Sequence, residues 1–320
     1  MKISVIICTY NRCASLKLTL ERLAALIPSA PCGCELIVMD NNSRDATKAV
    51  VEACATGSGG KIRYLFEPRQ GKSFALNTAI ETAEGDVLAF TDDDVIVDRE
   101  WLVRIHRAFL DGEISCAGGR IYPRWGKRRP NWLTPELHPY LALLDLGEKK
   151  KKMTEPMLWG ANLIIRKSMF KKHGMFDVSL GRTGGKLYGN EEIELIRNLI
   201  EKGEGVYYLP NVVVQHCINE NRMKKGYFRK WMFDAGELEG LQMGEYPHRN
   251  LMGVPYFKIK DAVATVAGFA KDTLQRKQNI FLDEMFVCKT LGFISGRIKY
   301  HKSLSLAAGS TGRGTEKALD

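Results

Sequence analysis

Short apolar runs alternate with amphipathic segments through the first 120 residues, and this alternation limits the fold more than any other feature of the chain. The apolar runs occupy residues 3–8, 35–39, 61–66, 87–90 and 114–120. The intervening segments carry apolar side chains at helical spacing, in residues 15–27, 45–55, 72–83 and 99–110. Because strands that alternate with helices pair in parallel through right-handed crossovers, the sequence predicts an α/β fold with a mostly parallel central sheet flanked by helices.

The alternation stops after residue 120. Residues 122–157 are rich in Pro, Trp and Lys, which predicts a long basic loop or a mobile lid. Regular patterning then returns, with a helix that begins at Glu191 and a strand pair around residues 206–214 that reaches His216.

Beyond residue 219 the pattern becomes helical and amphipathic, with Val263, Val266, Ala270 and Leu274 on one face. The last residues are rich in Gly, Ser and charge. We therefore expect a domain over residues 1–220 with halves 1–120 and 121–220, a helical extension over 221–305 and a disordered tail over 306–320.

Charge and cysteine content narrow the class of protein. The net charge is +10, with basic clusters in residues 120–152 and 258–302. Such clusters attract phosphorylated small molecules or anionic lipid headgroups, or form a solvated basic face, and the scarcity of interleaved aromatic residues argues against nucleic acid. The eight cysteines include no Cys-x-x-Cys pair, so zinc is not expected. No stretch approaches the roughly 18 apolar residues of a membrane span, and the N-terminal run is too short for a secretory signal, so we expect a cytoplasmic chain with reduced thiols.

Three consecutive carboxylates, Asp92, Asp93 and Asp94, directly follow the apolar run 87–90. Open α/β sheets bind their ligands at the carboxyl ends of their strands. An Asp-x-Asp pair can aim two carboxylates at one hard divalent ion, although a solvated acidic turn is the alternative. The sequence therefore predicts a metal or phosphate site at this edge.

The turn after the first run, Cys8-Thr-Tyr-Asn-Arg12, excludes two common nucleotide sites. It has neither the G-x-G-x-x-G of a dinucleotide fold nor the G-x-x-x-x-G-K-[ST] of a P-loop. What remains is a set of polar residues at strand ends, namely Thr9, Asp40, Asp92 and Asp94, which form a candidate crevice.

Five motifs in order carry a family resemblance: V-I-I-C-T-Y-N-R, V-M-D-N-N-S-R-D, G-K-S-F-A-L-N, F-T-D-D-D and G-N-E-E-I-E-L. Together they resemble family 2 glycosyltransferases of the GT-A fold, over roughly residues 2–217. The resemblance implies a Rossmann-like nucleotide-diphospho-sugar transferase fold, with residues 1–120 as the nucleotide-binding half and 121–220 as the acceptor half. It also implies inverting, metal-dependent transfer of a hexosyl unit from a nucleotide sugar to a hydroxyl acceptor, of the kind used in polysaccharide biosynthesis. The Q-x-x-R-W motif of processive synthases is absent, which favours transfer of a single sugar.

The resemblance assigns metal and base-reading roles to particular residues. Asp94, with Asp92, would hold Mg²⁺ or Mn²⁺ on the donor diphosphate, and Asp92 would also contact the ribose or donor sugar. His216 matches a position that ligates metal in some GT-A enzymes, with a structural histidine as the alternative. Asp40 would read the nucleotide base, or else close an Asx turn.

The family places its catalytic base in an acidic pair at a helix start, usually Glu-Asp, which here reads Glu191-Glu192. Glu192 matches the aspartate and is the expected general base, but the longer side chain leaves the choice between the two glutamates open. First-turn acids also stabilise a helix by themselves, here with Asn190 as the cap. The remaining donor contacts that the resemblance implies are Thr9, Tyr10, Asn11, Arg12, Asn42, Gly71, Lys72, Asn77, Asp93, Trp159 and Gly160. Trp159 is either a sugar platform or a core residue.

The expected partners are a nucleotide-sugar donor, with a UDP-sugar favoured, and a saccharide or lipid-linked acceptor. The basic loop and the amphipathic C-terminal helices suggest peripheral association with the inner face of the cell membrane. The same helices would also suit packing on the catalytic domain or a homodimer. Two other function classes stay open from the residues: a sugar-phosphate nucleotidyltransferase and a non-catalytic carbohydrate-binding scaffold.

Overall fold

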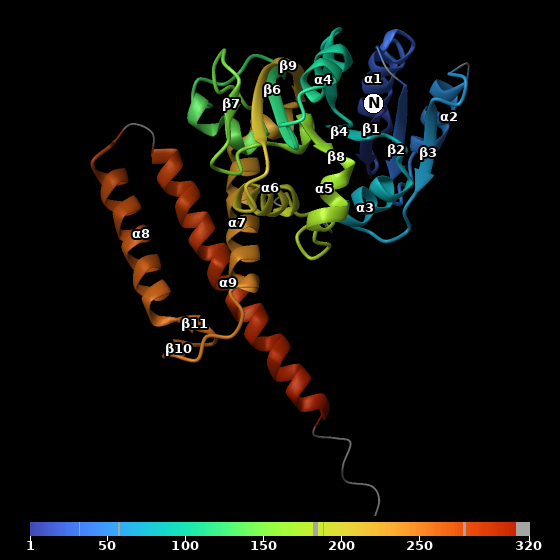
Figure 1. Cartoon of the computed structure of the whole chain (residues 1–320). Helices are drawn as coiled ribbons and strands as arrows, with labels where there is room; N and C mark the ends of the chain where they lie inside the picture. Colours follow the sequence, from blue (N-terminus) through green and yellow to red (C-terminus); the bar gives the residue numbers. More distant parts are fainter. Residues whose placement is uncertain (32, 57, 182–184, 188, 278–279, 312–320) are drawn as a thin grey trace, which may run out of the picture. The chain divides into compact units, whose positions relative to one another are not determined.

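The computed structural model describes residues 1–31, 33–56, 58–181, 185–187, 189–277 and 280–311, in two compact units (Figure 1). The first unit comprises Met1–Gly185 and Gly189–Glu220, and the second comprises Lys186–Tyr188 and Asn221–Asp320. The first unit is an α/β fold and the second is helical.

The first unit is built on one mixed sheet. Its strands are β1 (Ile3–Thr9), β2 (Cys34–Asp40), β3 (Ile62–Phe66), β4 (Val87–Asp92), β5 (Val95–Val97), β6 (Cys116–Trp125), β7 (Lys151–Lys152), β8 (Leu163–Arg166) and β9 (Val206–Ile218). They lie in the order β3-β2-β1-β4-β8-β6-β9-β5, with β7 on β9. The β3-β2-β1-β4 half and the long β6–β9 pair are parallel, whereas β8, β5 and β7 are antiparallel to their neighbours. The largely parallel α/β architecture that the alternation predicted is confirmed.

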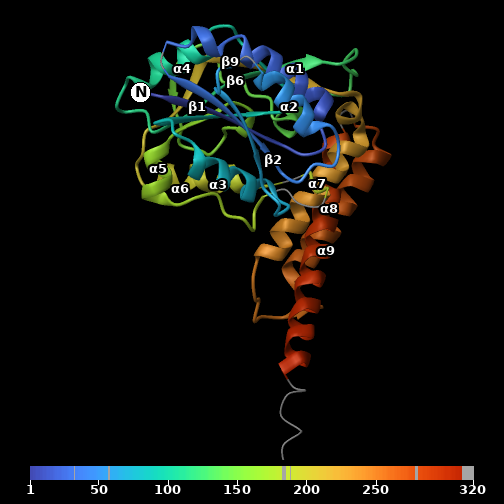
Figure 2. The same ribbon diagram turned by 90° about the vertical axis from the view of Figure 1, so that its right-hand side faces the viewer.

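Helices cover both faces of this sheet. They are α1 (Cys13–Ala24), α2 (Thr47–Ala55), α3 (Lys72–Thr82), α4 (Trp101–Phe109), α5 (Lys167–His173) and α6 (Glu191–Glu201), with short 3₁₀ turns η1 (Ile27–Ser29), η2 (Pro135–Leu141) and η3 (Gly160–Asn162). Figure 2 shows α1, α2 and α4 on one face and α3, α5 and α6 on the other. Because both faces are covered, the first strands read as continuous apolar runs, and every residue of β2 is buried.

Strand register gathers the polar strand ends. β1 pairs in parallel with both β2 and β4, which places Thr9 beside Asp40 and Cys8 beside Asp92. The carboxyl ends of these three strands therefore meet at one edge of the sheet, as the sequence predicts.

The prediction of an irregular loop or lid over residues 122–157 is corrected by the structure. β6 continues to Trp125 because it pairs with β9 along its whole length, and η2 and β7 follow within the same range. Leucines at the spacing of short turns anchor the segment in the core, namely Leu133, Leu137, Leu141, Leu143 and Leu144. The prediction of a loop was wrong because it used the average composition of the segment, in which these leucines are outnumbered by basic and polar residues.

The predicted strand pair around residues 206–214 is one continuous strand, β9. Its register against β6 shifts between Gly119 and Arg120, which pair with Leu209 and Val213. The extra residues include Pro210, which has no backbone N–H to donate to a ladder and is tolerated at such a bulge. Pro210 therefore lies at a bulge within one strand, and not at a turn between two strands.

The second unit contains η4 (Glu220–Met223), α7 (Lys225–Gln242), a hairpin of β10 (Asn250–Leu251) and β11 (Val254–Pro255), α8 (Tyr256–Leu274) and α9 (Ile280–Thr311). α7 and α9 approach closely because glycines line their contact; a Cβ on Gly236 would lie 1.9 Å from the carbonyl oxygen of Lys289. Among the described residues, no helix is long and apolar enough to cross a membrane.

The boundary of the predicted tail also changes. α9 continues to Thr311, so residues 306–311, which composition assigned to a disordered tail, are helical. Leu and Ala in this stretch extend an existing helix at little cost. Residues 312–320 of the predicted tail lie outside the described residues.

Candidate active site

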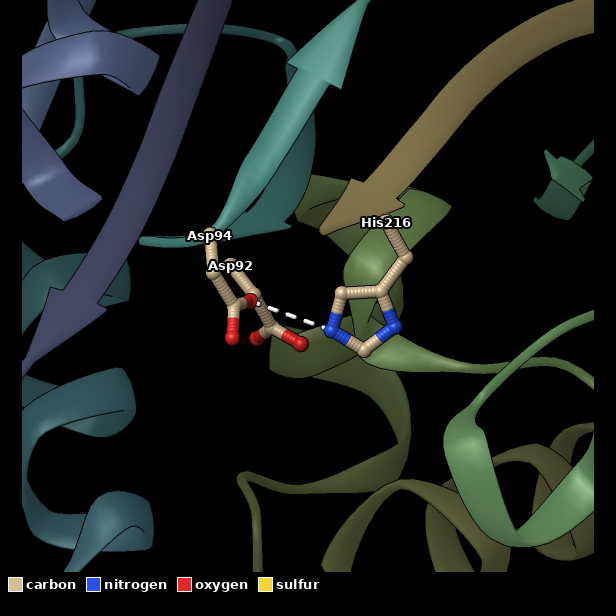
Figure 3. Close-up of side chains that lie close together, drawn as sticks. All are labelled: Asp92, Asp94 and His216. Atoms are coloured by element: carbon tan, nitrogen blue, oxygen red, sulfur yellow. Dashed lines mark hydrogen bonds and ion pairs between the residues drawn. The ribbon is translucent and has the colours of Figure 1, made fainter. Parts of the chain in front are cut away.

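Two carboxylates and an imidazole converge at the carboxyl edge of the sheet (Figure 3). Asp92 ends β4, Asp94 lies in the turn to β5, and His216 lies on β9, where it pairs with Val95. One ligand atom from each of the three lies within 4.8 Å of the others. Asp94 and His216 are buried, whereas Asp92 is partly exposed. The sheet thus joins residues that are separated by more than a third of the chain.

The hydrogen bonds of His216 orient its ring toward the acids. Its Nδ1 lies 2.8 Å from the carbonyl oxygen of Leu141, which only accepts, so Nδ1 carries a proton. Its Nε2 lies 3.1 Å from Asp94 Oδ1. The Nε2 edge of the ring is thereby presented to Asp94. A backbone carbonyl that accepts from Nδ1 is the usual arrangement for a metal-binding imidazole, and the two carboxylates with this imidazole fit a divalent cation.

Asp93 points into the protein and holds the turn. Thr9 Oγ1 donates to its Oδ2 at 2.8 Å, and Arg12 Nη1 donates to its Oδ1 at 3.1 Å and to Asp94 Oδ2 at 2.9 Å. Thr19 Oγ1 donates to its backbone oxygen at 3.1 Å. Burial raises the pKa of Asp93 to about 6, against the lowering effect of the Arg12 charge. The structure thus engages Asp93, Thr9 and Arg12 with one another, and Arg12 links Asp93 to Asp94.

Lys72 at the start of α3 faces the acidic pair of α6. Its Nζ lies 2.6 Å from Glu192 Oε1, 3.6 Å from Glu191 and 3.9 Å from Asp92. Glu192 lines a small pocket together with Lys72, Asp92 and Gly160, whereas the Glu191 side chain is only 2% exposed. Through Lys72, the tertiary structure therefore brings both predicted glutamates close to Asp92. It also gives them different surroundings, since Glu192 lines the pocket and Glu191 is buried.

Asn41 builds the loop that places Lys72, and sequence reasoning missed it. Its amide donates to the backbone oxygen of Arg69 at 2.7 Å and accepts from the backbone N–H of Gly71 at 2.8 Å. Gly71 has a φ of 145°, a conformation that favours glycine, just before α3 begins. The signal that could have found Asn41 is its position directly after the strand-end Asp40 in V-M-D-N-N-S.

Asp40 lies at the predicted place but is bound within the protein. Its Oδ1 accepts from the backbone N–H of Ser43 at 2.9 Å, and its Oδ2 accepts from the hydroxyl of Tyr64 at 2.8 Å. The first of these bonds reaches three residues along the chain and closes the bend that contains Asn42, which has a φ of 66°. The base-reading role of Asp40 stays a prediction.

The loops after β1 and β2 clasp each other. The Asn11 backbone N–H donates to Ser43 Oγ at 2.9 Å, and Asn11 Oδ1 accepts from the backbone N–H of Arg44 at 2.7 Å. Tyr10 between these strand ends is exposed. Asn11 therefore supports the crevice, and the exposed Tyr10 ring is open to a ligand.

Two other predicted donor contacts face different surroundings. The Asn77 amide donates to the carbonyl oxygen of Phe176 at 2.8 Å and accepts from its N–H at 3.1 Å, so it clamps backbone. Trp159 is half-buried, and its indole nitrogen is buried with no hydrogen-bond partner among the described residues. Cys8, which the sequence did not single out, lines the pocket beside Lys72 and Asp92.

Known proteins resemble this chain in sequence and in fold. The chain is 27% identical over 250 residues to the succinoglycan biosynthesis protein ExoM of Rhizobium meliloti (strain 1021), covering 78% of this chain and 77% of that protein. It is 26% identical over 227 residues to the glucosyl-dolichyl phosphate glucuronosyltransferase of Haloferax volcanii, covering 69% of this chain and 71% of that protein. A mannosyltransferase from Pyrobaculum calidifontis, PcManGT, solved with GDP-Man and Mn²⁺, shares the fold with a TM-score of 0.58 at 16% identity, covering 93% of this chain and 86% of that one.

The family profile described as glycosyl transferase family 2 matches residues 4–174. This match covers more than half of the 320 residues and includes the acidic turn, the Lys72 loop and Trp159. The nucleotidyltransferase and scaffold alternatives find no support in it. The chain belongs to glycosyl transferase family 2.

Proposed function

We propose that this glycosyltransferase is an inverting, metal-dependent enzyme that moves a single sugar from a nucleotide-diphosphate sugar to a hydroxyl group of a lipid-linked saccharide. The observation that carries the proposal is the arrangement of two acidic groups around one small pocket. Asp92 lines this pocket on the sheet side and lies with Asp94 and His216 behind it, and Glu192 lines it beside Lys72 on the helix side. A metal–diphosphate anchor and a proton acceptor are the two parts that such a displacement needs.

Asp94, Asp92 and His216 would hold the metal, and Mn²⁺ or Mg²⁺ fits the carboxylate-rich donor set. When bound, the cation would stabilise the negative charge of the departing diphosphate. Charge balance supports this assignment: Asp92, Asp93, Asp94, Glu191 and Glu192 gather here, and Arg12 and Lys72 supply the positive charges that pair with them. PcManGT, the structural neighbour, was solved with Mn²⁺.

Glu192 is the stronger candidate for the general base. Its carboxylate is 16% exposed and lines the pocket, so an acceptor hydroxyl can reach it, whereas Glu191 is buried behind it. The acceptor hydroxyl would lose its proton to Glu192 while its oxygen attacks the anomeric carbon from the face opposite the diphosphate, which inverts that carbon. Lys72 would hold Glu192 in place and, through its proximity to Asp92, would lie near the donor phosphates.

Other contacts support substrate positions. The indole N–H of Trp159 has no acceptor among the described residues, and a sugar hydroxyl would supply one. The exposed Tyr10 and the Asp40 turn would line the nucleotide end, with a UDP-sugar favoured as donor. A lipid-linked acceptor is supported by the glucosyl-dolichyl phosphate named for the Haloferax volcanii relative.

A substitution at Gly160 is expected to disturb the base without unfolding the protein. A Cβ on Gly160 would lie 2.0 Å from Glu192 Oε1, so Gly160→Ala must push the carboxylate aside. Because a flexible side chain can move, the thermal unfolding midpoint should stay near that of wild type, while kcat falls on the order of tenfold or more from misplacement of the base. Gly112→Ala, at an exposed glycine where an added Cβ would meet nothing within 4 Å, is the control. Unchanged kcat in Gly160→Ala would contradict a tightly placed Glu192.

A donor screen tests the proposed function directly. Purified protein is mixed with UDP-, GDP-, dTDP- and CMP-sugars, with and without Mn²⁺, and thermal unfolding and release of nucleoside diphosphate are measured. We expect one nucleotide class to raise the unfolding midpoint only when metal is present, since a ligand that binds the folded state stabilises it. Anomeric configuration of the transferred sugar, read by NMR, then tests inversion. A product that retains the donor configuration would rule out the single displacement.

A further inference from the structure

The helix α8 has almost no protein core to pack against. Of its 19 residues only Ala262 is buried. Helices in proteins are stabilised mainly by packing of an apolar face, and an isolated helix of this length is marginal in water. Val, Thr, Phe and Gly in its interior are also weak helix formers. Its apolar side chains therefore need another surface.

These side chains form one continuous stripe. Tyr256, Ile259, Val263, Val266, Ala270 and Leu274 recur every three or four residues, which places them on one side of the helix. Val263 is 65% exposed and Leu274 is 84% exposed, and no residue of the stripe is buried. We call these six residues the α8 stripe.

Charge is distributed asymmetrically around the α8 stripe. Lys260 and Lys271 each precede a stripe residue by three positions, so they flank the stripe, and both are exposed. The acids of the helix, Asp261 and Asp272, each lie two positions from stripe residues and therefore point to the opposite side. An apolar band edged by lysines, with its acids turned away, is complementary to an anionic lipid surface.

The hairpin that precedes α8 adds a second apolar element. Leu251 and Met252 at its tip are both exposed. Met252 has a φ of 50° and Gly253 one of 80°, so the two form a turn whose first position ordinarily carries Asn, Asp or Gly. A large apolar side chain in that position is costly in water and useful where the tip enters a lipid headgroup layer.

We propose that the α8 stripe, with the hairpin tip at Leu251 and Met252, is a docking surface for a bilayer that contains anionic lipids. A second copy of the chain suits the stripe less well. In an antiparallel two-fold pairing of stripes, the lysine edges of the two helices would lie on the same side, so Lys260 and Lys271 of each copy would face those of the other while Asp261 and Asp272 point away. Snorkelling lysines at the edge of a bilayer meet phosphate instead. The surface extends the proposed function by placing the enzyme where a lipid-linked acceptor resides, but the docking itself does not require transfer.

Vesicle co-sedimentation of the full chain tests this surface. The probes are phosphatidylcholine vesicles and vesicles of phosphatidylcholine mixed with phosphatidylglycerol. Wild type is expected to bind the anionic vesicles, and the double variant Val263→Gln/Leu274→Gln should bind on the order of tenfold or more weakly, because two apolar side chains no longer leave water. Leu110→Gln, at a leucine of the first unit that is 67% exposed, makes the same exchange elsewhere and should bind as wild type does.

A second pair of variants tests the charge. Lys260→Gln/Lys271→Gln should weaken binding to anionic vesicles by roughly tenfold and leave binding to neutral vesicles unchanged. Lys61→Gln/Lys202→Gln, at exposed lysines of the first unit, is the matched control. Circular dichroism should show the same helix content in every variant without lipid, because the exchanged side chains are exposed.

Three outcomes would overturn the proposal: no binding of wild type to anionic vesicles, equal binding by Val263→Gln/Leu274→Gln, or a wild-type dimer that this variant converts to monomer. The last outcome would assign the α8 stripe to a second copy. Metal-dependent hydrolysis of the nucleotide sugar in solution should be equal in wild type and all four variants. Loss of docking with hydrolysis intact thus separates a failure of this inference from a failure of the proposed function.

Discussion

Replacing Glu192 by Gln is expected to abolish sugar transfer while leaving the fold and donor binding in place. The amide oxygen of Gln can still accept from Lys72 Nζ, which lies 2.6 Å from Glu192 Oε1, so the local geometry is retained. What is lost is the ability to take a proton from the acceptor hydroxyl. Loss of a general base typically lowers kcat by roughly 10²- to 10⁴-fold. Single-turnover transfer and donor affinity, measured side by side, check both parts of the expectation.

Glu194→Gln is the matched control, because Glu194 lies in the same first turn of α6 and its carboxylate is 42% exposed. It should transfer sugar as wild type does. Glu191→Gln is the informative companion. Because Glu191 is buried, its replacement should lower the unfolding midpoint, while the protein that remains folded keeps a kcat near that of wild type. Undiminished transfer by Glu192→Gln would contradict its assignment as the base.

Replacing Asp94 by Asn is expected to remove the metal and with it nearly all turnover. Asp94 Oδ1 lies 3.1 Å from His216 Nε2 and its Oδ2 lies 2.9 Å from Arg12 Nη1, so its carboxylate holds both groups in one site. Without the metal the diphosphate leaves poorly, and we expect transfer to fall on the order of a thousandfold. Mn²⁺ binding, followed by electron paramagnetic resonance, should weaken in parallel. Removal of metal from wild type with a chelator should reproduce the loss, and added Mn²⁺ should reverse it.

Asp98→Asn is the control for this exchange, since the Asp98 carboxylate lies 3.5 Å from Arg104 and four residues beyond the acidic turn. It should bind Mn²⁺ and transfer sugar normally. Full turnover by Asp94→Asn in the presence of chelator would overturn both the metal site and its proposed role.

The positions of the acids at strand ends could be predicted because they depend on local pattern. Val87–Asp92 reads as a buried strand, and parallel pairing with Ile3–Thr9 follows from the alternation of strands and helices. The acidic start of α6 could likewise be predicted, because glutamates in a first turn are both a helix signal and a family motif. The sequence therefore identifies four candidate site residues, Asp92, Asp94, Glu191 and Glu192.

What each of those side chains does within the protein could not be predicted, because it depends on partners distant in sequence. The acidic run alone does not show what Asp93 contacts, and the structure gives it Thr9 and Arg12 as partners. Asn77 resembled a donor contact, yet its amide clamps the backbone of Phe176, which is 99 residues away. The average composition of the basic segment after residue 122 predicts a loop. That average hides the individual leucines that are buried and hold the segment against the core.

The sequence by itself determined an α/β fold of family 2 glycosyltransferase type with acids at its strand ends. The spacing of apolar residues distinguishes strands from helices, and strands that alternate with helices pair in parallel. Only the tertiary structure decided that His216 of β9 turns its Nε2 to Asp94, that Lys72 lies closer to Glu192 than to Glu191, and that none of the α8 stripe is buried by the described part of the chain. These outcomes depend on distances between residues far apart in the chain and on which surfaces remain exposed. A local sequence pattern determines neither these distances nor these exposed surfaces, since both arise only when the helices and strands have packed.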